Sequence, residues 1–317
     1  MKPQHVLIDT DTGVDDALAL VFALRSPELV IEAITTVAGN VGVRKCTRNV
    51  LRILNLVRSM HVPRVAEGSP KPLYRPLVTA PEVHGRDGLG DVPSRRRIAG
   101  LAEAVRRNAV REILDACDRF GDRLTIIALG PLTNIAKAWR KNAESLRKVG
   151  RIISMGGAFR VPGNTGPVAE FNYFVDPEAA DQILTSGLPV RVIPLDLTET
   201  IILHWHELRK RARKEGSELS RFLIRCTKHY MSYHRKTRGF FGGYLHDPVA
   251  VAAAIDQNLF TWRTMEVRIE TRGIWTRGMS VEPSHGRGRA SVAVAQTLSH
   301  RRFLKLFTSR IWNEAHG

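Results

Sequence analysis

The chain has 317 residues, of which 43% are hydrophobic, so it can fill a sizeable core and is expected to be globular. Its 48 Lys and Arg against 31 Asp and Glu give a net charge of +17, but these basic residues are scattered along helical stretches, which argues against a nucleic-acid partner. The three cysteines form no C-x-x-C pair, and no apolar stretch approaches eighteen residues, so we expect a cytoplasmic protein with reduced thiols and no membrane segment.

Apolar segments rich in β-branched residues alternate with segments of helical periodicity through the first two thirds of the chain. This order predicts an α/β fold with an open, mostly parallel central sheet flanked by helices, similar to a Rossmann fold. The predicted strands are 5–9, 29–39, 123–129, 151–157 and 190–197. The predicted helices are 15–25, 43–59, 99–119, 132–140 and 177–186.

The last third of the chain has a different pattern. After about residue 200 we expect a polar helical region, then an apolar helix at 247–255, and a last helix from about 299. Short strands are predicted near 265–271, 278–282 and 289–293. No internal repeat is present, so residues 1–317 are expected to form a single domain.

Four aspartates follow the first predicted strand in the segment "VLIDTDTGVDDALAL", namely Asp9, Asp11, Asp15 and Asp16. A helix cap needs only one of them, and four mutually repelling carboxylates cost free energy unless a cation or shared protons offset the repulsion. Oxygen ligands favour Ca²⁺ or Mg²⁺ over Zn²⁺. Gly13 is expected to give this turn a backbone conformation closed to other residues. Ligands of parallel sheets bind at the carboxyl ends of the strands, where this cluster lies.

Two enzyme families share part of this segment. The "DTD" resembles the D-x-D of haloacid dehalogenase-type phosphatases, which would make Asp9 the nucleophile of a Mg²⁺-dependent reaction. The longer "DTDTGVDD" is similar to the D-T-D-x-G-x-D-D of inosine-uridine-preferring nucleoside hydrolases. A nucleoside-binding or ribose-binding protein without catalysis is a third hypothesis, so the other motifs must decide.

Three further segments resemble nucleoside hydrolase motifs, although each alone is also typical of a turn or helix cap. "TTVAGN" ends in Asn40, "LGPLTNIA" begins at Leu129, and "HDPVAVA" begins with His246 and Asp247. A lone His is more often structural than catalytic, but the motif around His246 reverses that expectation. Asp176, in contrast, is explained by a helix cap before Pro177.

Other polar residues are candidates for substrate contacts. "GNTGPVAEFNYF" contains Asn164, Glu170 and Asn172, which suit sugar hydroxyls, and the last two would point the same way in an extended segment. His84 belongs to a long loop rich in Pro and Gly, at about 68–95. A further set repeats every four residues and would share one helix face, although a solvated surface explains it equally well: Tyr230, His234 and Arg238.

The resemblance to nucleoside hydrolases extends in order from Asp9 to Asp247 and implies both a fold and an activity. The implied reaction is hydrolysis of the N-glycosidic bond of a ribonucleoside to free base and ribose, by a homodimer or homotetramer. Ca²⁺ would be held by Asp11, Asp16, Asp247 and the Leu129 carbonyl, with Asp11 also the general base.

The family resemblance also implies how the substrate is held. Ribose hydroxyls would contact Asp15, Asn40, Asn164, Glu170 and Asn172. His246 would serve the leaving base, with His84 and the face of Tyr230, His234 and Arg238 nearby. His234 stands where relatives typically have Tyr, which leaves the choice between purine and pyrimidine open. Asp9 would only support the loop.

Overall fold

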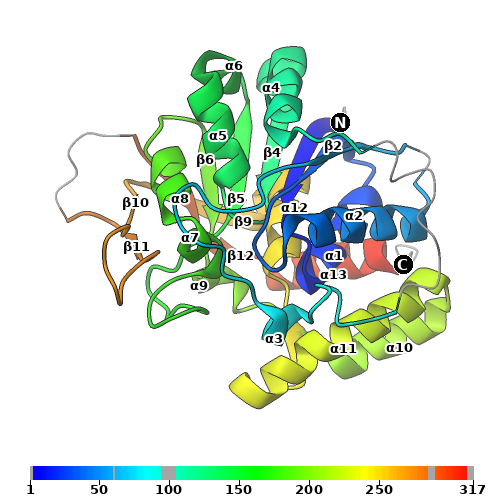
Figure 1. Cartoon of the computed structure of the whole chain (residues 1–317). Helices are drawn as coiled ribbons and strands as arrows, with labels where there is room; N and C mark the ends of the chain where they lie inside the picture. Colours follow the sequence, from blue (N-terminus) through cyan, green and yellow to red (C-terminus); the bar gives the residue numbers. More distant parts are fainter. Residues whose placement is uncertain (1–2, 60, 94–104, 285–289, 313–317) are drawn as a thin grey trace.

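The computed structural model describes residues 3–59, 61–93, 105–284 and 290–312, and a central sheet runs through it (Figure 1). The sheet has eight strands in the order β3-β2-β1-β4-β5-β6-β12-β9. They are β1 (Gln4–Thr10), β2 (Leu29–Thr36), β3 (Arg64–Glu67), β4 (Leu124–Ala128), β5 (Arg151–Met155), β6 (Val190–Ile193), β9 (Phe260–Met265) and β12 (Val292–Leu298). Within the described residues every neighbouring pair is parallel except β9 with β12. The predicted open, mostly parallel α/β sheet is therefore confirmed, and its first six strands follow the Rossmann order.

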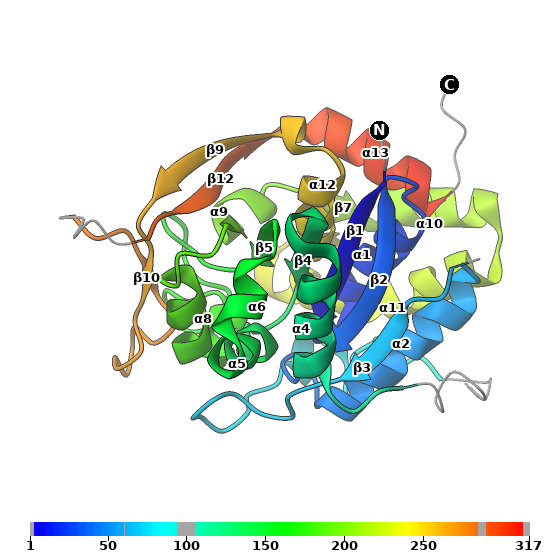
Figure 2. The ribbon, with the colours of Figure 1, turned by 90° about the horizontal axis from the view of Figure 1, so that it is seen from above.

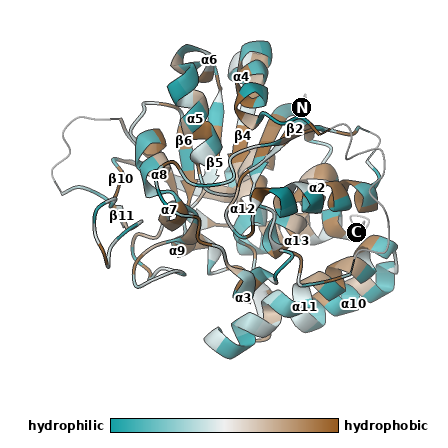
Figure 3. Cartoon of the chain, in the orientation of Figure 1, coloured by the Kyte–Doolittle hydropathy of each residue, from teal (hydrophilic) through white to brown (hydrophobic). Residues whose placement is uncertain are grey.

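Helices cover both faces of the sheet (Figure 2), which explains why its central strands are almost continuously apolar. One face packs against α1 (Val14–Leu24), α2 (Val43–Val57), α12 (His246–Ile255) and α13 (His300–Ile311). The other packs against α4 (Ala109–Phe120), α5 (Thr133–Lys141), α6 (Ala143–Arg147) and α8 (Pro177–Leu184). The strands are brown in the hydropathy colouring, whereas the outer helices carry teal on their exposed sides (Figure 3). No helix among the described residues has the length and apolar character needed to cross a membrane.

Shorter elements surround the carboxyl edge of the sheet. The helices there are α3 (Pro81–His84), α7 (Phe171–Val175) and α9 (Leu195–Thr198), and the longer pair is α10 (Trp205–Glu215) and α11 (Glu218–Arg238). Two small antiparallel pairs are formed by β7 (Ile202–His204) with β8 (Gly242–Tyr244) and by β10 (Arg268–Ile269) with β11 (Ser280–Val281). Single 3-10 turns occur at Gly121–Arg123 and Gln257–Leu259.

Several predicted boundaries are wrong. The helix predicted at 99–119 begins only at Ala109, where Asn108 caps it by accepting a hydrogen bond from the Arg111 N–H, and 99–104 lie outside the described residues. The short strand β3 was missed because four residues carry no readable periodicity. The predicted strand at 265–271 is divided between β9 and the two-residue β10. The strand predicted at 289–293 is β12, which continues to residue 298.

The topology brings the acidic motifs together. Strand β1 ends at Thr10 between β2 and β4, so the loops that follow these three strands share one edge of the sheet. Helices α1 and α12 pack side by side against the same face, and their first turns contain Asp15, Asp16 and Asp247. Two helix N-termini, which carry partial positive charge, thus face the carboxylates.

Candidate active site

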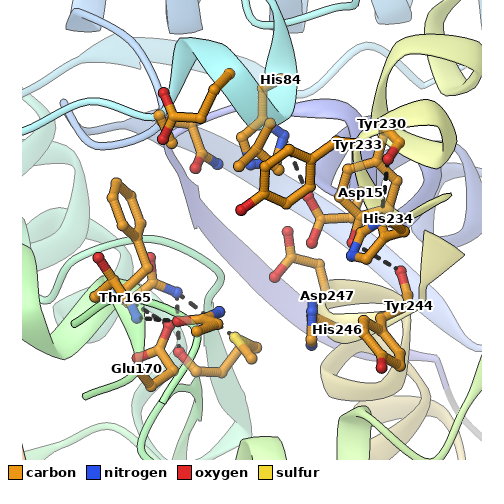
Figure 4. A pocket seen from close by; sticks show the side chains of 18 of the residues that line it. Asp15, His84, Thr165, Glu170, Tyr230, Tyr233, His234, Tyr244, His246 and Asp247 are labelled. Atoms are coloured by element: carbon orange, nitrogen blue, oxygen red, sulfur yellow. Dashed lines mark hydrogen bonds and ion pairs between the residues drawn. The ribbon is translucent and has the colours of Figure 1, made fainter. Parts of the chain in front are cut away.

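A cavity of about 370 Å³ opens at this edge of the sheet (Figure 4). Its walls contain nearly all of the predicted site residues, namely Asp15, Asn40, His84, Leu129, Asn164, Glu170, Asn172, Tyr230, His234, Arg238, His246 and Asp247. Asp11 and Asp16 lie just beneath it and are fully buried. Residues as far apart in sequence as Asp15 and Asp247 thus meet around one pocket of a size suited to a small molecule.

The floor of the cavity is a cluster of buried carboxyl groups. Oxygen atoms of Asp15, Asp16 and Asp247 lie within 4.8 Å of one another. Figure 4 shows Asp15 and Asp247 pointing toward each other in the cavity. Burial is the main cause that raises the pKa of each, with mutual repulsion adding to it for Asp15 and Asp247, and the pKa of Asp15 reaches about 8.

Asp11 adjoins this cluster, and only one of its two carboxylate oxygens accepts a hydrogen bond from the described residues. Its Oδ2 accepts a hydrogen bond from the Asn40 N–H at 2.7 Å, whereas its buried Oδ1 has no hydrogen-bond partner among the described residues. Burial, followed by the charge of Asp16, raises the pKa of Asp11 well above its usual range. A buried acceptor without a partner beside other carboxylates fits a cation that supplies the missing positive charge.

The residues present therefore suit a hard divalent cation. The donors are carboxylate oxygens, and no thiol or imidazole belongs to the buried acidic group found among the described residues. Oxygen donors of this kind select Ca²⁺ or Mg²⁺. Asp15, which the family resemblance assigns to ribose binding, is one of the three aspartates whose oxygen atoms lie within 4.8 Å of one another. It lines the cavity itself, whereas Asp11 and Asp16 do not.

Asp16 is held by three donors. Its Oδ1 accepts from the Thr10 hydroxyl at 2.5 Å, and its Oδ2 accepts from the Gly13 N–H at 2.7 Å and from Asn40 Nδ2 at 3.2 Å.

The prediction of an unusual backbone conformation at Gly13 is wrong, because its backbone is ordinary extended chain and Thr12 has the positive φ of 20°. Glycine is required there for space, since a Cβ would lie 2.6 Å from His84 Nδ1.

Asp9 is separated from the cavity. Its Oδ1 accepts from the Thr35 hydroxyl at 2.5 Å and from Asn134 Nδ2 at 2.8 Å, and its backbone carbonyl accepts from the Leu129 N–H at 2.8 Å. Burial raises the pKa of Asp9 to about 7. A group so enclosed cannot attack a substrate in the cavity, which argues against the phosphatase hypothesis.

The predicted sugar-binding residues lie in the cavity wall, but their local structure differs from expectation. Glu170 and Asn172 do not belong to an extended segment, because Glu170 caps the short helix α7 and accepts from the Asn172 and Tyr173 N–H groups. Asn172 Nδ2 donates to the Leu129 carbonyl at 2.8 Å, and Asn164 Oδ1 accepts from the Phe171 N–H. The Glu170 carboxylate is thus only partly free for a ligand, because both of its oxygens already accept from backbone N–H groups.

Three buried histidines, His84, His234 and His246, line the cavity. Their hydrogen bonds indicate which ring nitrogen carries the proton. His84 Nδ1 accepts from the Val14 N–H at 3.1 Å, so its proton is on Nε2. His246 Nδ1 lies 2.7 Å from the Thr198 hydroxyl, which has no other hydrogen-bond partner among the described residues. We assign Thr198 as the donor and place the His246 proton on Nε2, because the opposite tautomer would leave the Thr198 O–H without an acceptor among the described residues. Burial is the main cause that lowers the pKa of both histidines to about 3.

The predicted face of α11 lines the cavity, with two of its members buried and Arg238 exposed. Tyr230 and His234 are buried, and Arg238 forms an ion pair with Glu199 at 3.2 Å. Two supporting residues lie outside every motif found in the sequence, because a hydroxyl or a carboxylate in such a segment is ordinary: Thr198 and Glu199. Gly39 is needed because a Cβ there would lie 2.1 Å from Asp11 Oδ2.

Similar proteins have the same architecture. Residues 6–305 match the family model described as inosine-uridine preferring nucleoside hydrolase. The chain is 38% identical over 278 residues to uridine nucleosidase 1 of Arabidopsis thaliana, covering 86% of this chain and 80% of the relative. It is 40% identical over 281 residues to the pyrimidine-specific ribonucleoside hydrolase RihA of Salmonella typhimurium, covering 87% of each.

Solved structures agree with these matches. A purine-preferring ribonucleoside hydrolase from Gardnerella vaginalis superposes with a TM-score of 0.90 at 33% identity and covers 98% of both chains. The plant nucleoside hydrolase PpNRh1 superposes with a TM-score of 0.88 at 35% identity, covering 98% of this chain and 100% of the other. The chain therefore belongs to the inosine-uridine preferring nucleoside hydrolase family and is a ribonucleoside hydrolase, an enzyme of the glycosidase type.

Proposed function

We propose that this enzyme hydrolyses the N-glycosidic bond of ribonucleosides in a Ca²⁺-dependent reaction with Asp11 as the general base. The observation that carries the proposal is the buried Oδ1 of Asp11, which has no hydrogen-bond partner among the described residues and adjoins the carboxylates under the cavity. Asp11, Asp16, Asp247 and the Leu129 carbonyl would hold the cation. When bound, the cation lowers the pKa of a water molecule and so makes it a nucleophile near neutral pH.

The chain's own groups then act on the substrate. Asp11 takes the proton of the attacking water, and the sugar develops positive charge at C1′ as its bond to the base breaks. Asp15, Asn40, Asn164, Glu170 and Asn172 are proposed to hold the ribose hydroxyls. Most of these groups are already fixed by backbone hydrogen bonds, which supports a preorganised sugar site.

His246 is proposed to donate a hydrogen bond to the leaving base. Because Thr198 donates to Nδ1, the N–H is on Nε2, and burial keeps the ring neutral at pH 7. A neutral ring donor stabilises the negative charge that develops on the base without first being protonated to imidazolium. His84 would supply a second neutral N–H donor from the side of the cavity across from His246.

Replacing His246 by Ala is expected to lower kcat on inosine and uridine by about 100-fold, the lower range for losing a group that assists proton transfer. Nitrophenyl riboside has a leaving group that needs no such assistance, so its hydrolysis should change much less. Equal losses on both substrates would exclude the proposed role. Release of base, followed by ultraviolet absorbance, measures the first reaction, and nitrophenolate absorbance measures the second.

Thr198 provides a matched test of His246 orientation. Thr198→Val removes the hydroxyl with almost no change in shape, whereas Thr198→Ser keeps it. We expect Val to reduce kcat on inosine by about 10-fold, corresponding to one buried hydrogen bond, and Ser to restore most of the rate. If Val and Ser behave alike, the hydroxyl does not position the histidine.

The wider activity can be tested with a panel. We expect reducing sugar to be released from ribonucleosides and no phosphate from nucleotides or sugar phosphates. Phosphate release would restore the phosphatase hypothesis, and binding without turnover would favour a nucleoside-binding protein. The homodimeric or homotetrameric assembly stays a prediction of the family resemblance and can be measured by light scattering. The cytoplasmic location stays a prediction from the sequence pattern.

A further inference from the structure

The third histidine of the cavity, His234, differs from the other two in its hydrogen bonding. It lies on α11, is 5% exposed and lines the cavity. Its Nδ1 lies 3.0 Å from the backbone carbonyl of Tyr230. A carbonyl oxygen can only accept, so Nδ1 carries the proton and donates it.

The other ring nitrogen of His234 is therefore an acceptor. Nε2 has a free lone pair and has no hydrogen-bond partner among the described residues. Burial lowers the pKa of His234 to about 4, so the ring stays neutral at pH 7 and Nε2 keeps its lone pair. His84 and His246, both assigned with their proton on Nε2, line the same cavity, and His234 has the reverse assignment.

The surroundings keep the ring in place. Its plane stacks on Phe240 with centroids 5.7 Å apart and meets the edges of Tyr230 and Tyr244 at 4.5 and 5.0 Å. Figure 4 shows His234 and Tyr244 on the side of the cavity that lies across from Glu170. Two of the nearby polar groups are already used, since the Tyr230 hydroxyl donates to the Tyr244 carbonyl and Arg238 pairs with Glu199. A fixed neutral acceptor in a buried wall suits an N–H group of a ligand.

We propose that His234 is a specificity-determining residue whose Nε2 accepts a hydrogen bond from a ring N–H of the nucleobase. The inference rests on the proposed function, because it takes a ribonucleoside as the ligand and places the ribose at the end of the cavity that Glu170 lines. Uracil offers this group at N3 and hypoxanthine at N1. A substrate that lacks the N–H leaves a buried acceptor without a partner, which costs binding free energy in the transition state.

The test compares two matched substrate pairs, uridine with 3-methyluridine and inosine with 1-methylinosine. In each pair a methyl group replaces the hydrogen of the ring N–H. The ratio of kcat/KM within a pair is measured for the wild type with added Ca²⁺, and for His234→Phe and His234→Gln. Phenylalanine keeps the aromatic packing but removes the acceptor, whereas glutamine has an amide oxygen that can accept.

The wild type is expected to prefer the unmethylated member of at least one pair by about 10-fold or more, as one buried hydrogen bond would give. His234→Phe should reduce that preference to about threefold or less, and His234→Gln should recover part of it. The same ratio in wild type and His234→Phe for both pairs would overturn the inference, as would a wild type without preference. Melting temperatures check that each variant folds, and the ratio is internal to each protein.

Failure of the inference can be told apart from failure of the proposed function. If the wild type releases base from neither uridine nor inosine, the proposed function is wrong. If it hydrolyses either of them but the methyl group has the same effect with His and with Phe at 234, only the role of His234 is wrong.

Discussion

Asp11→Asn is expected to lower kcat on ribonucleosides by about 1,000-fold, within the range for losing a general base. The amide cannot take a proton from water, although it retains almost the same shape in the buried loop. Its oxygen can still accept from the Asn40 N–H, so the loop should keep its conformation. The loss should appear in kcat more than in KM, since the base acts in the transition state. Reducing-sugar release from inosine and uridine measures it.

Asp9→Asn is the matched control, because Asp9 lies two residues earlier and is equally buried. Asparagine can still accept the hydrogen bonds of Thr35 and Asn134 at one oxygen, so we expect its kcat to stay within about 10-fold of wild type, the cost of disturbing one hydrogen bond. A phosphatase of the D-x-D type would show the reverse order, with Asp9→Asn inactive. Asp11→Asn with wild-type kcat would refute the role of the base.

Removal of divalent cations is expected to abolish activity and to lower the melting temperature, and Ca²⁺ should restore both. At a Ca²⁺ concentration 100 times its Kd, binding to the folded state alone stabilises by about 2.7 kcal/mol. Calorimetry of EDTA-treated protein, with and without Ca²⁺, gives a readout independent of catalysis. Full activity in EDTA, or an unchanged melting temperature on adding Ca²⁺, would contradict the proposed site.

The cation-free protein should also respond to pH in a defined direction. Folding raises the pKa of Asp15 to about 8 and that of Asp9 and Glu170 to about 7, all well above their unfolded values. The folded state then binds more protons than the unfolded state, so stability falls as pH rises from 6.5 to 8.0. The buried histidines have lowered pKa values, so the titration of their unfolded forms near 6.5 opposes this fall at the lower end of the window, and the fall should be clearest above about pH 7.5. Ca²⁺ should flatten the slope, and a slope of the opposite sign would contradict the coupled carboxylates.

The sheet could be predicted from the sequence because its strands carry a strong signal. Strands buried on both faces are almost continuously apolar, as in β1 and β4, and helices such as α1 and α2 were located to within about two residues. The order of elements then determined where the aspartates would lie, since the carboxyl ends of neighbouring parallel strands share one edge.

The details that failed depend on contacts distant in sequence or on elements too short to carry a periodic pattern. The need for glycine at 13 comes from His84, some 70 residues later, and the role of Glu170 as a helix cap comes from a helix of five residues. Likewise, nothing in the residues around Thr198 indicates that its hydroxyl meets His246. Side-chain pairing of this kind is decided by tertiary packing, which local patterns do not report.

The central claim is that the acidic cluster under the cavity is the centre of a cation-dependent N-glycosidase. Its most direct test is hydrolysis of inosine and uridine in ¹⁸O-labelled water, with mass spectrometry of the free base and of the ribose, which borohydride reduces at once so that its C1 oxygen does not exchange with water. We predict that ribose gains one labelled oxygen, that the base gains none, and that EDTA stops the reaction until Ca²⁺ is returned. Absence of labelled ribose in the presence of Ca²⁺, or label transfer that continues in EDTA, would contradict it.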